Sequence, residues 1–331
     1  YFETAYHFGI HPMKVLMLVS DKQRIQLDCL YEGIAKHCDL DLRRLSSKEQ
    51  DNIAKYFKHN VNTKQYTRII MFLRFKKEIR QVAFIRTIPN LVILEHDASQ
   101  NYNPQSKYQN KFSRHYSALP WARILVSGAA LSKKLCNEGF DARFVSKGYD
   151  QSLLKNTQQE RPIELGFIGN TEHDTYIKRK ELLEKARNDF GLYITRTNSG
   201  HEYLETLNKI RFFLSADIGF GEYMVKNFEA MACGCVLITY SQGEEENQML
   251  GFKDMENVVL YDNIKSLEKK LDMLREHQEL VEKIAKNGQQ LVETSFTFDK
   301  VGNDVIKAIT PPLRKQGQAS ILDVGKYFFR R

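Results

Sequence analysis

Short apolar runs alternate with amphipathic stretches along most of this chain. "KVLMLVS" at residues 14–20 is such a run, and the segment after it carries apolar residues at the spacing of one helix face. The alternation continues through "DLDLRRL" at 39–45 and through apolar runs at 67–73, 91–96, 123–128 and 142–148, with helical stretches near 47–58 and 129–140. Strands buried on both faces are continuously apolar, so this pattern predicts a parallel sheet with helices on both sides.

A second series of the same kind begins after a polar segment that lacks periodicity and ends in a proline. Strands are expected at 163–170, 192–197, 211–218 and 257–262, with helices at 178–190, 201–210 and two across 264–293. The predicted fold class is α/β, with two doubly wound Rossmann-like domains that face a cleft. In such sheets ligands bind beyond the carboxyl ends of the strands.

The same pattern sets the expected domain boundaries. We expect an N-terminal domain over 13–149, a hinge over 150–162 and a C-terminal domain over 163–310. Residues 1–12 have no regular period and are interpreted as a leader. A tail over 311–331 opens with two prolines, and its apolar residues form one helical face that packs either on a domain or on a membrane surface.

Composition narrows the classes of protein that fit. The chain has 331 residues with 42% apolar content, which suits two cores, and no apolar run is long enough to span a bilayer. A net charge of +8 favours an anionic partner: nucleotide phosphate, an anionic lipid surface or nucleic acid. Five cysteines argue against a disulfide framework. We interpret Cys233 and Cys235 as small thiols packed in a turn, because no second Cys or His cluster accompanies them.

Two common nucleotide motifs are absent. Neither domain carries Gly-x-Gly-x-x-Gly after its first strand, which argues against a nicotinamide or flavin enzyme. The Walker pattern is absent as well, which argues against a P-loop triphosphatase. No cofactor is therefore expected. No metal site is expected either, because no Asp-x-Asp motif lies in a plausible loop and no Cys or His cluster has zinc-site spacing.

The segment 219–240 is predicted to be a loop, a helix, a glycine-containing turn and a strand. Gly219 and Gly221 free the backbone before the helix, whose first N–H groups can face an anion. Lys226 adds positive charge for a phosphate, and Glu229 can accept two hydrogen bonds from a diol such as a ribose. The alternative is a solvated i,i+3 ion pair on an ordinary helix.

"FEAMACGCVLITY" at 228–240, with the segment 250–298 after it, resembles the C-terminal domain of GT-B fold glycosyltransferases of group 1 (family 4-like). The branch that it most resembles, spore-coat-type and surface-polysaccharide transferases, has a basic residue three positions before the motif glutamate, here Lys226. "IELGFIGN" fits the first strand of that domain and "FVSKGYDQSLL" fits its hinge segment. The N-terminal half matches in layout only.

The resemblance implies roles for named residues. Glu229 is the second glutamate of the E-x7-E motif and holds the ribose, while Lys226 neutralises the diphosphate. The first glutamate, which contacts the donor sugar, falls on Gly221, so either Glu222 takes that contact through a shifted loop or backbone N–H groups do. Lys178, Arg179 or Lys180 either assists with the phosphates or belongs to a solvated helix start. The expected donor-binding residues are Gly169, Lys178, Arg179, Gly221, Tyr223, Met224, Lys226, Asn227 and Glu229.

The N-terminal domain is expected to supply the acceptor side. His96 and Asp97 follow the run at 91–96 and resemble the group that contacts the donor sugar or acceptor; the alternative for His96 is a histidine that is hydrogen-bonded in a loop. With Glu222 they are the catalytic candidates. Asp21, Lys22 and Arg24 are weaker candidates. The basic and aromatic segment 101–121 is either an amphipathic helix for an anionic membrane or a core-facing helix with a solvated basic side.

The function expected from these residues and the resemblance is transfer of a sugar from a nucleotide diphosphate sugar to an acceptor hydroxyl. We expect it to be retaining, metal-independent and part of surface polysaccharide, lipopolysaccharide or glycolipid synthesis, with the protein in the cytoplasm or peripheral on the inner face of the membrane. One rival is a nucleotide-sugar epimerase or sugar phosphorylase of the same fold. Another is a non-enzymatic basic protein that binds nucleic acid, but no recognition motif supports it, so no nucleic-acid partner is expected.

Overall fold

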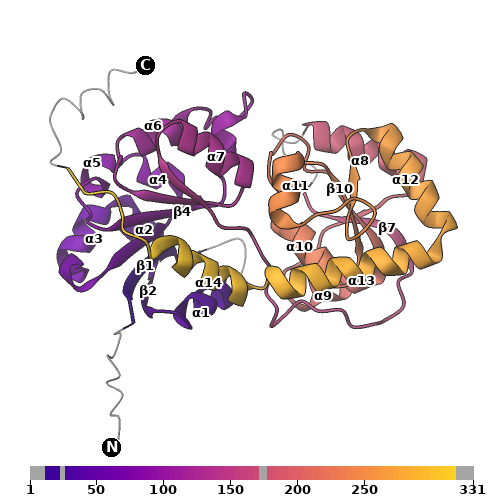
Figure 1. The fold of residues 1–331 in the computed structure, drawn as a ribbon, viewed down its shortest axis with the longest axis horizontal. Helices are drawn as coiled ribbons and strands as arrows, with labels where there is room; N and C mark the ends of the chain where they lie inside the picture. Colours follow the sequence, from indigo (N-terminus) through magenta and orange to yellow (C-terminus); the bar gives the residue numbers. More distant parts are fainter. Residues whose placement is uncertain (1–11, 23–26, 171–176, 318–331) are drawn as a thin grey trace, which may run out of the picture.

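A computed structural model describes residues 12–22, 27–170 and 177–317 of the chain. Two α/β units lie side by side, one at each end of the molecule (Figure 1). The first contains six parallel strands in the order β2-β1-β3-β4-β5-β6, and the second contains five in the order β11-β10-β9-β7-β8. Two doubly wound Rossmann-like domains, as the apolar runs predicted, are thereby confirmed.

The first sheet and its helices occupy residues 14–144. The strands are β1 (Lys14–Ser20), β2 (Asp39–Leu45), β3 (Arg68–Phe72), β4 (Leu91–Glu95), β5 (Arg123–Val126) and β6 (Asp141–Phe144). The α-helices are α1 (Asp28–Ala35), α2 (Ser47–Asp51), α3 (Ile53–Asn60), α4 (Phe75–Glu78), α5 (Val82–Ile85), α6 (Lys111–Ser117) and α7 (Ala129–Asn137). Two 3-10 turns, η1 (Thr63–Gln65) and η2 (Ala98–Tyr102), complete this unit.

The second sheet and its helices follow from residue 163. The strands are β7 (Ile163–Ile168), β8 (Tyr193–Thr195), β9 (Ile210–Ser215), β10 (Val236–Tyr240) and β11 (Val259–Tyr261). The helices are α8 (Ile177–Phe190), α9 (His201–Lys209), α10 (Val225–Ala232), α11 (Glu244–Leu250), α12 (Ile264–Glu276), α13 (Gln278–Ser295) and α14 (Phe298–Ile309).

Burial on both faces of each sheet explains why the central strands are apolar without alternation. In β1, Leu16 and Leu18 pack in one core cluster, while Val15, Met17 and Val19 pack in another. The strand order is 2-1-3-4-5-6 in the first sheet and 2-1-3-4-5 in the second, and in both the direction of winding reverses beside the first strand. The reversal lies between β1 and β3 in the first unit and between β7 and β9 in the second. These are the points where doubly wound sheets bind ligands.

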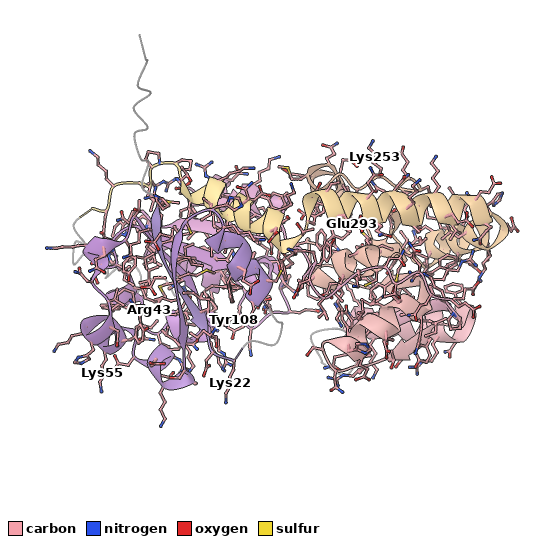
Figure 2. All side chains as sticks on the ribbon, turned by 90° about the horizontal axis from the view of Figure 1, so that it is seen from below. Lys22, Arg43, Lys55, Tyr108, Lys253 and Glu293 are labelled. Atoms are coloured by element: carbon pink, nitrogen blue, oxygen red, sulfur yellow. The ribbon has the colours of Figure 1, made fainter. Side chains whose placement is uncertain are left out.

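The last helix differs from the expected domain boundary, because α14 leaves the second unit and packs on the first. Its apolar side joins the core cluster of α1 and β1, through Val301, Val305 and Ile309 among others. A Cβ on Gly302 would lie 2.4 Å from the carbonyl carbon of Gly33, so two glycines permit this close helix contact. Figure 2 shows α13 and α14 following one another along one edge of both units, opposite Lys22 and Lys55. The pattern predicts an apolar helix face but not which sheet receives it.

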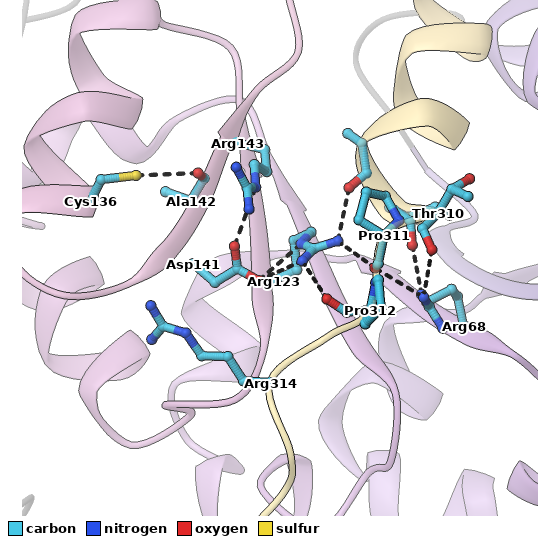
Figure 3. A network of polar contacts seen from close by, with 12 residues as sticks. Arg68, Arg123, Cys136, Asp141, Ala142, Arg143, Thr310, Pro311, Pro312 and Arg314 are labelled. Atoms are coloured by element: carbon cyan, nitrogen blue, oxygen red, sulfur yellow. Dashed lines mark hydrogen bonds and ion pairs between the residues drawn. The ribbon is translucent and has the colours of Figure 1, made fainter.

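The segment after α14 is held against the amino-terminal ends of β3 and β5 (Figure 3). Arg68 donates to the carbonyl oxygens of Ile309 (2.7 Å), Thr310 and Pro311 (3.1 Å each). Arg123 donates to the carbonyl oxygens of Ala308 (3.1 Å), Pro311 (2.8 Å) and Pro312 (2.9 Å). The described part of the tail therefore packs on the first unit, and the apolar tail residues at 321–328 lie outside the described residues.

Three local expectations have clear outcomes. The stretch 47–58 forms two helices, because Asn52 leaves helical geometry and caps α3. In the segment 101–121, α6 has only seven residues and buries Phe112, His115 and Tyr116, which agrees with the core-facing alternative. Cys233 and Cys235 are buried free thiols, as interpreted. None of the helices within the described ranges is long and apolar enough to cross a bilayer.

Candidate functional site

The loop between β9 and α10 lies at the winding reversal of the second sheet. Gly219 and Gly221 have φ values of 78° and 70°, and neither has an atom within 4 Å of an added Cβ. Backbone conformation, not crowding, therefore favours glycine at both positions. The side chain of Met224 makes no capping hydrogen bond at the start of α10. This loop is where the sequence predicted an anion-binding helix start.

Lys226 extends from α10 to the carboxyl end of β7. Its Nζ donates to the carbonyl oxygen of Ile168 at 2.6 Å, and a Cβ on Gly169 would lie 3.1 Å from that Nζ. Burial lowers the pKa of Lys226. Arg179 of α8 forms an ion pair with Asp217, which follows β9. The structure thus gathers Gly169, Lys226 and Arg179 at the β7–β9 edge, whereas Lys178 is exposed.

Glu229 lies one turn further along α10 and faces α9. Its Oε2 accepts a hydrogen bond of 2.5 Å from the hydroxyl of Tyr203, and burial raises its pKa. Within the described ranges, Lys226 and Glu229 form no ion pair with each other, and both are only partly exposed. The alternative of a solvated i,i+3 pair therefore does not describe this helix.

Glu222 is fully buried and faces the first unit. Its Oε2 accepts a hydrogen bond of 2.6 Å from Ser127 Oγ and lies 2.9 Å from Lys147 Nζ. Its Oε1 has no hydrogen-bond partner within the described part of the chain. Ser127 follows β5 and Lys147 follows β6, so the carboxyl edges of the two sheets meet at this carboxylate. Its expected contact with a sugar stays a prediction.

His96 follows β4 at the same edge of the first sheet. Its ring packs edge-on against Phe72 with the centroids 5.1 Å apart. Burial, and secondarily the charge of Lys147, lowers the pKa of His96 to about 3. The imidazole is therefore neutral at physiological pH, and it lies close to the lysine that holds Glu222. Asp97 is exposed, and its N–H donates to Glu95 Oε1 at 2.8 Å.

The remaining predicted residues surround this centre. Tyr223 is buried with its hydroxyl on Asn247, and Met224 Sδ lies 3.7 Å from Lys147 Nζ. Asn227 is buried, and neither polar atom of its side chain has a partner among the residues described. Gly221 N donates to Gln242 Oε1 at 2.9 Å. Tyr223 and Gly221 are thus held by other residues of the second unit, whereas Met224 contacts the first unit.

The weaker candidates after β1 are placed only in part. Asp21 and Lys22 are exposed, and the carbonyl oxygen of Lys22 accepts a hydrogen bond of 3.1 Å from Arg74. Arg24 lies outside the described residues.

A cavity of about 170 Å³ opens between the two units beside this centre. The first unit contributes residues of η2, the position after it and α7, and the second unit contributes the loop after β9 and one residue after β10. The lining consists of Ser99, Tyr102, Asn103, Ala130, Leu131, Lys134, Gly219, Phe220, Gly221 and Gln242. Its walls contain polar side chains and two aromatic rings, those of Tyr102 and Phe220.

Sequence reasoning missed three residues of this centre: Ser127, Lys147 and Glu246. Glu246 of α11 accepts hydrogen bonds from the backbone N–H groups of Ala129 (2.7 Å) and Ala130 (3.2 Å) of the other unit. A lysine inside the apolar run at 142–148 was the available signal for Lys147. Glu246 lies in an acidic helix start and gave no such signal. No group of three or more His, Cys, Asp or Glu that could hold a metal occurs among the residues that the structure describes.

Comparison with known proteins gives a family match for the second half of the chain and a fold for most of it. Residues 153–307 match the model of the family described as glycosyl transferase-like, which covers the second unit. A search of curated proteins found no match.

Three solved structures share the fold over most of the chain. Anabaena HepE in complex with UDP and glucose has a TM-score of 0.67 at 13% identity, covering 91% of this chain and 100% of its own. A glycosyltransferase from Rickettsia africae has a TM-score of 0.57 at 11% identity, covering 90% and 98%. An alpha-glucosyltransferase in complex with UDP-glucose and DNA also has a TM-score of 0.57 at 11% identity, covering 90% and 100%. These findings confirm the GT-B fold and support the expected enzyme class, a glycosyltransferase.

Proposed function

We propose that this chain is a glycosyltransferase that moves a sugar from a nucleoside diphosphate sugar to an acceptor hydroxyl. The observation that carries the proposal is the position of Lys226 in a glycosyl transferase-like domain. Its ammonium lies at the carboxyl end of β7, where a doubly wound sheet binds its ligand, and Glu229 follows on the same helix. This arrangement places a cation for the diphosphate one helical turn from a carboxylate for the ribose.

The chemistry requires charge stabilisation more than acid or base strength. As the bond from the anomeric carbon to the diphosphate oxygen breaks, negative charge grows on the leaving diphosphate. Lys226 and the first N–H groups of α10 stabilise that charge. The acceptor oxygen forms the new bond to the anomeric carbon, and its proton passes to the departing diphosphate. We propose retention of anomeric configuration and no need for a metal, in keeping with the resemblance stated above.

The donor and acceptor sides follow from the two units. The second unit holds the donor. His96 and Asp97 of the first unit face the sugar or the acceptor, and Glu222 lies where the two units meet. Solved neighbours contain UDP or UDP-glucose, so UDP-glucose is the first donor to test. We propose an acceptor from surface polysaccharide, lipopolysaccharide or glycolipid synthesis, and a cytoplasmic protein that is either free or peripheral at the inner membrane face.

A donor screen tests this proposal. Thermal shift and hydrolysis are measured with UDP-, GDP-, ADP- and dTDP-sugars, followed by calorimetry with the best donor. A charge-assisted hydrogen bond contributes about 1.5–3 kcal/mol, so Lys226→Met should weaken donor binding by about 10- to 100-fold. Glu229→Gln should weaken binding of the nucleoside part. Lys253→Met is the matched control, because Lys253 is exposed in the same unit.

Three results would count against the proposal. Unchanged donor affinity in both Lys226→Met and Glu229→Gln would remove the proposed donor site. Interconversion of nucleotide sugars without an acceptor would indicate an epimerase. Release of sugar phosphate from a glycoside and inorganic phosphate would indicate a phosphorylase.

A further inference from the structure

Two carboxylates of the second unit are seated on the first unit, close to the proposed reaction centre. Glu222 lies on Lys147 and Ser127, and Glu246 lies on the N-terminal amides of α7. Figure 1 shows α7 and α11 facing each other across the boundary between the units. Each carboxylate bridges chain segments that are far apart in the sequence.

The Lys147–Glu222 pair is almost completely removed from solvent. The side chain of Lys147 is 4% exposed and that of Glu222 is 0% exposed. A buried pair of this kind tolerates loss of one partner poorly, because the remaining charge is left without compensation in a medium of low polarity. Separation of the two units would break this ion pair and expose both groups to water.

The second carboxylate completes a helix end. The N-cap residue of α7 is Gly128, which has no side chain to satisfy the first N–H groups of that helix. Glu246 of the other unit accepts from two of them and is 1% exposed. The helix start is thus satisfied across the boundary between the units.

Lys147 also belongs to the segment that connects the units. A Cβ on the next residue, Gly148, would lie 2.3 Å from the carbonyl oxygen of Phe296, on the returning segment. Tyr149 N donates to Phe296 O at 3.0 Å, and Phe298 N donates to Tyr149 O at 2.9 Å. The two connections are therefore packed and hydrogen-bonded to each other directly beside Lys147.

We propose that Lys147 is a positioning residue: through Glu222 and Ser127, and together with the Glu246 contact, it fixes the two units in the orientation that brings His96 to the donor site. Lys147 acts through Glu222 and does not bind the donor itself. Removing Lys147 should therefore lower turnover while leaving donor affinity near its original value, because Lys226 and Glu229 lie within the second unit. The turnover part of this inference rests on the proposed glycosyltransferase function. The orientation part does not.

The first test measures the separation of the units without any ligand. Small-angle X-ray scattering of the full chain compares Lys147→Met and Lys147→Arg with the wild type. Lys133→Met is the matched control, because Lys133 and Glu245 form an exposed ion pair of 3.0 Å across the same boundary. We expect a larger radius of gyration for Lys147→Met, partial recovery for Lys147→Arg and no change for Lys133→Met. An unchanged radius for Lys147→Met, or equal opening in the control, would overturn the proposal.

The second test separates positioning from binding. With the donor found in the screen, Lys147→Met should lower kcat at least tenfold while the donor Kd changes less than threefold. A loss of donor affinity equal to the loss of kcat would place Lys147 in the donor site and refute the positioning role. If Lys147→Met does not fold, Lys147→Gln takes its place with the same expected outcomes, because it removes the charge and leaves a hydrogen-bond donor for Glu222. If the chain transfers no sugar at all, the proposed function fails, and the scattering result still decides the orientation role.

Discussion

The contact between the C-terminal segment and the first sheet includes two ion pairs to the same aspartate, one buried and one exposed. It tests how burial changes the free energy of unfolding that an ion pair contributes. Arg123 and Arg143 both contact Asp141: Nη2 of Arg123 lies 2.9 Å from Oδ2, and Nε of Arg143 lies 3.3 Å from Oδ1 (Figure 3). The side chain of Arg123 is 3% exposed and that of Arg143 is 55% exposed. Only Arg123 also donates to three carbonyl oxygens at and beyond the end of α14, namely those of Ala308, Pro311 and Pro312.

We predict that Arg123→Met destabilises the protein far more than Arg143→Met. Breaking a buried ion pair typically costs about 3–5 kcal/mol, because the remaining charge stays buried. An exposed pair contributes about 0–1 kcal/mol. Arg143 still partners Asp141 in Arg123→Met, so we expect the lower part of the range, about 3 kcal/mol, against less than about 1 kcal/mol for Arg143→Met.

Urea unfolding followed by circular dichroism measures both variants against the wild type. The free-energy difference comes from the change in midpoint, provided that the slope of the transition is unchanged. Limited proteolysis should also cleave the segment after Ile309 faster in Arg123→Met, because its carbonyl anchors are lost. Equal destabilisation by the two substitutions, or none by Arg123→Met, would refute the argument from burial.

Two further predictions follow from shifted pKa values. Burial raises the pKa of Glu246 from 4.5 to about 7, so between these pH values the folded state binds more protons than the unfolded state. The stability that neutral Glu246 contributes is therefore complete below pH 4.5 and falls as the pH rises to about 7. The shift corresponds to about 3 kcal/mol, and Glu246→Gln should flatten the dependence of unfolding free energy on pH over this window; an unchanged slope would contradict the assignment. His96→Ala should lower kcat about tenfold or more. Since the pKa of His96 is about 3, titration of this imidazole should not change the wild-type rate near pH 6.5. A change of rate near pH 6.5 that is present in the wild type and absent in His96→Ala would show that the imidazole titrates normally.

The sequence predicted the two sheets well because their signal is local. The central strands are buried on both faces, so runs such as 14–20 are apolar without interruption, and the helix spacing between them is unambiguous. The helix α10 was predicted for the same reason, together with the glycines before it. Lys226 and Glu229 could be proposed because they lie three residues apart on that one helix.

The rest of the site depends on how the units dock, which no local pattern encodes. Lys147 and Glu222 are 75 positions apart, and Glu246 is 117 positions from Ala129. The packing of α14 on the first unit was not predicted for a related reason. Its apolar face fits either sheet, and the close packing of Gly33 against Gly302 identifies the first sheet as its partner. Contacts between residues so far apart in the sequence depend on the tertiary structure of both units.

Glu222 shows how the departure from the E-x7-E motif and the docking of the units are connected. At the position where the resemblance places the first glutamate, Gly221 has a left-handed backbone, and its N–H is bound by Gln242. The carboxylate of the next residue uses one oxygen for Lys147 and Ser127, while Oε1 has no partner within the described residues. A donor-sugar hydroxyl that binds Oε1 would thus contact a carboxylate already held by the first unit. The shift of one residue would then couple recognition of the sugar to closure of the cleft, since a single side chain serves both.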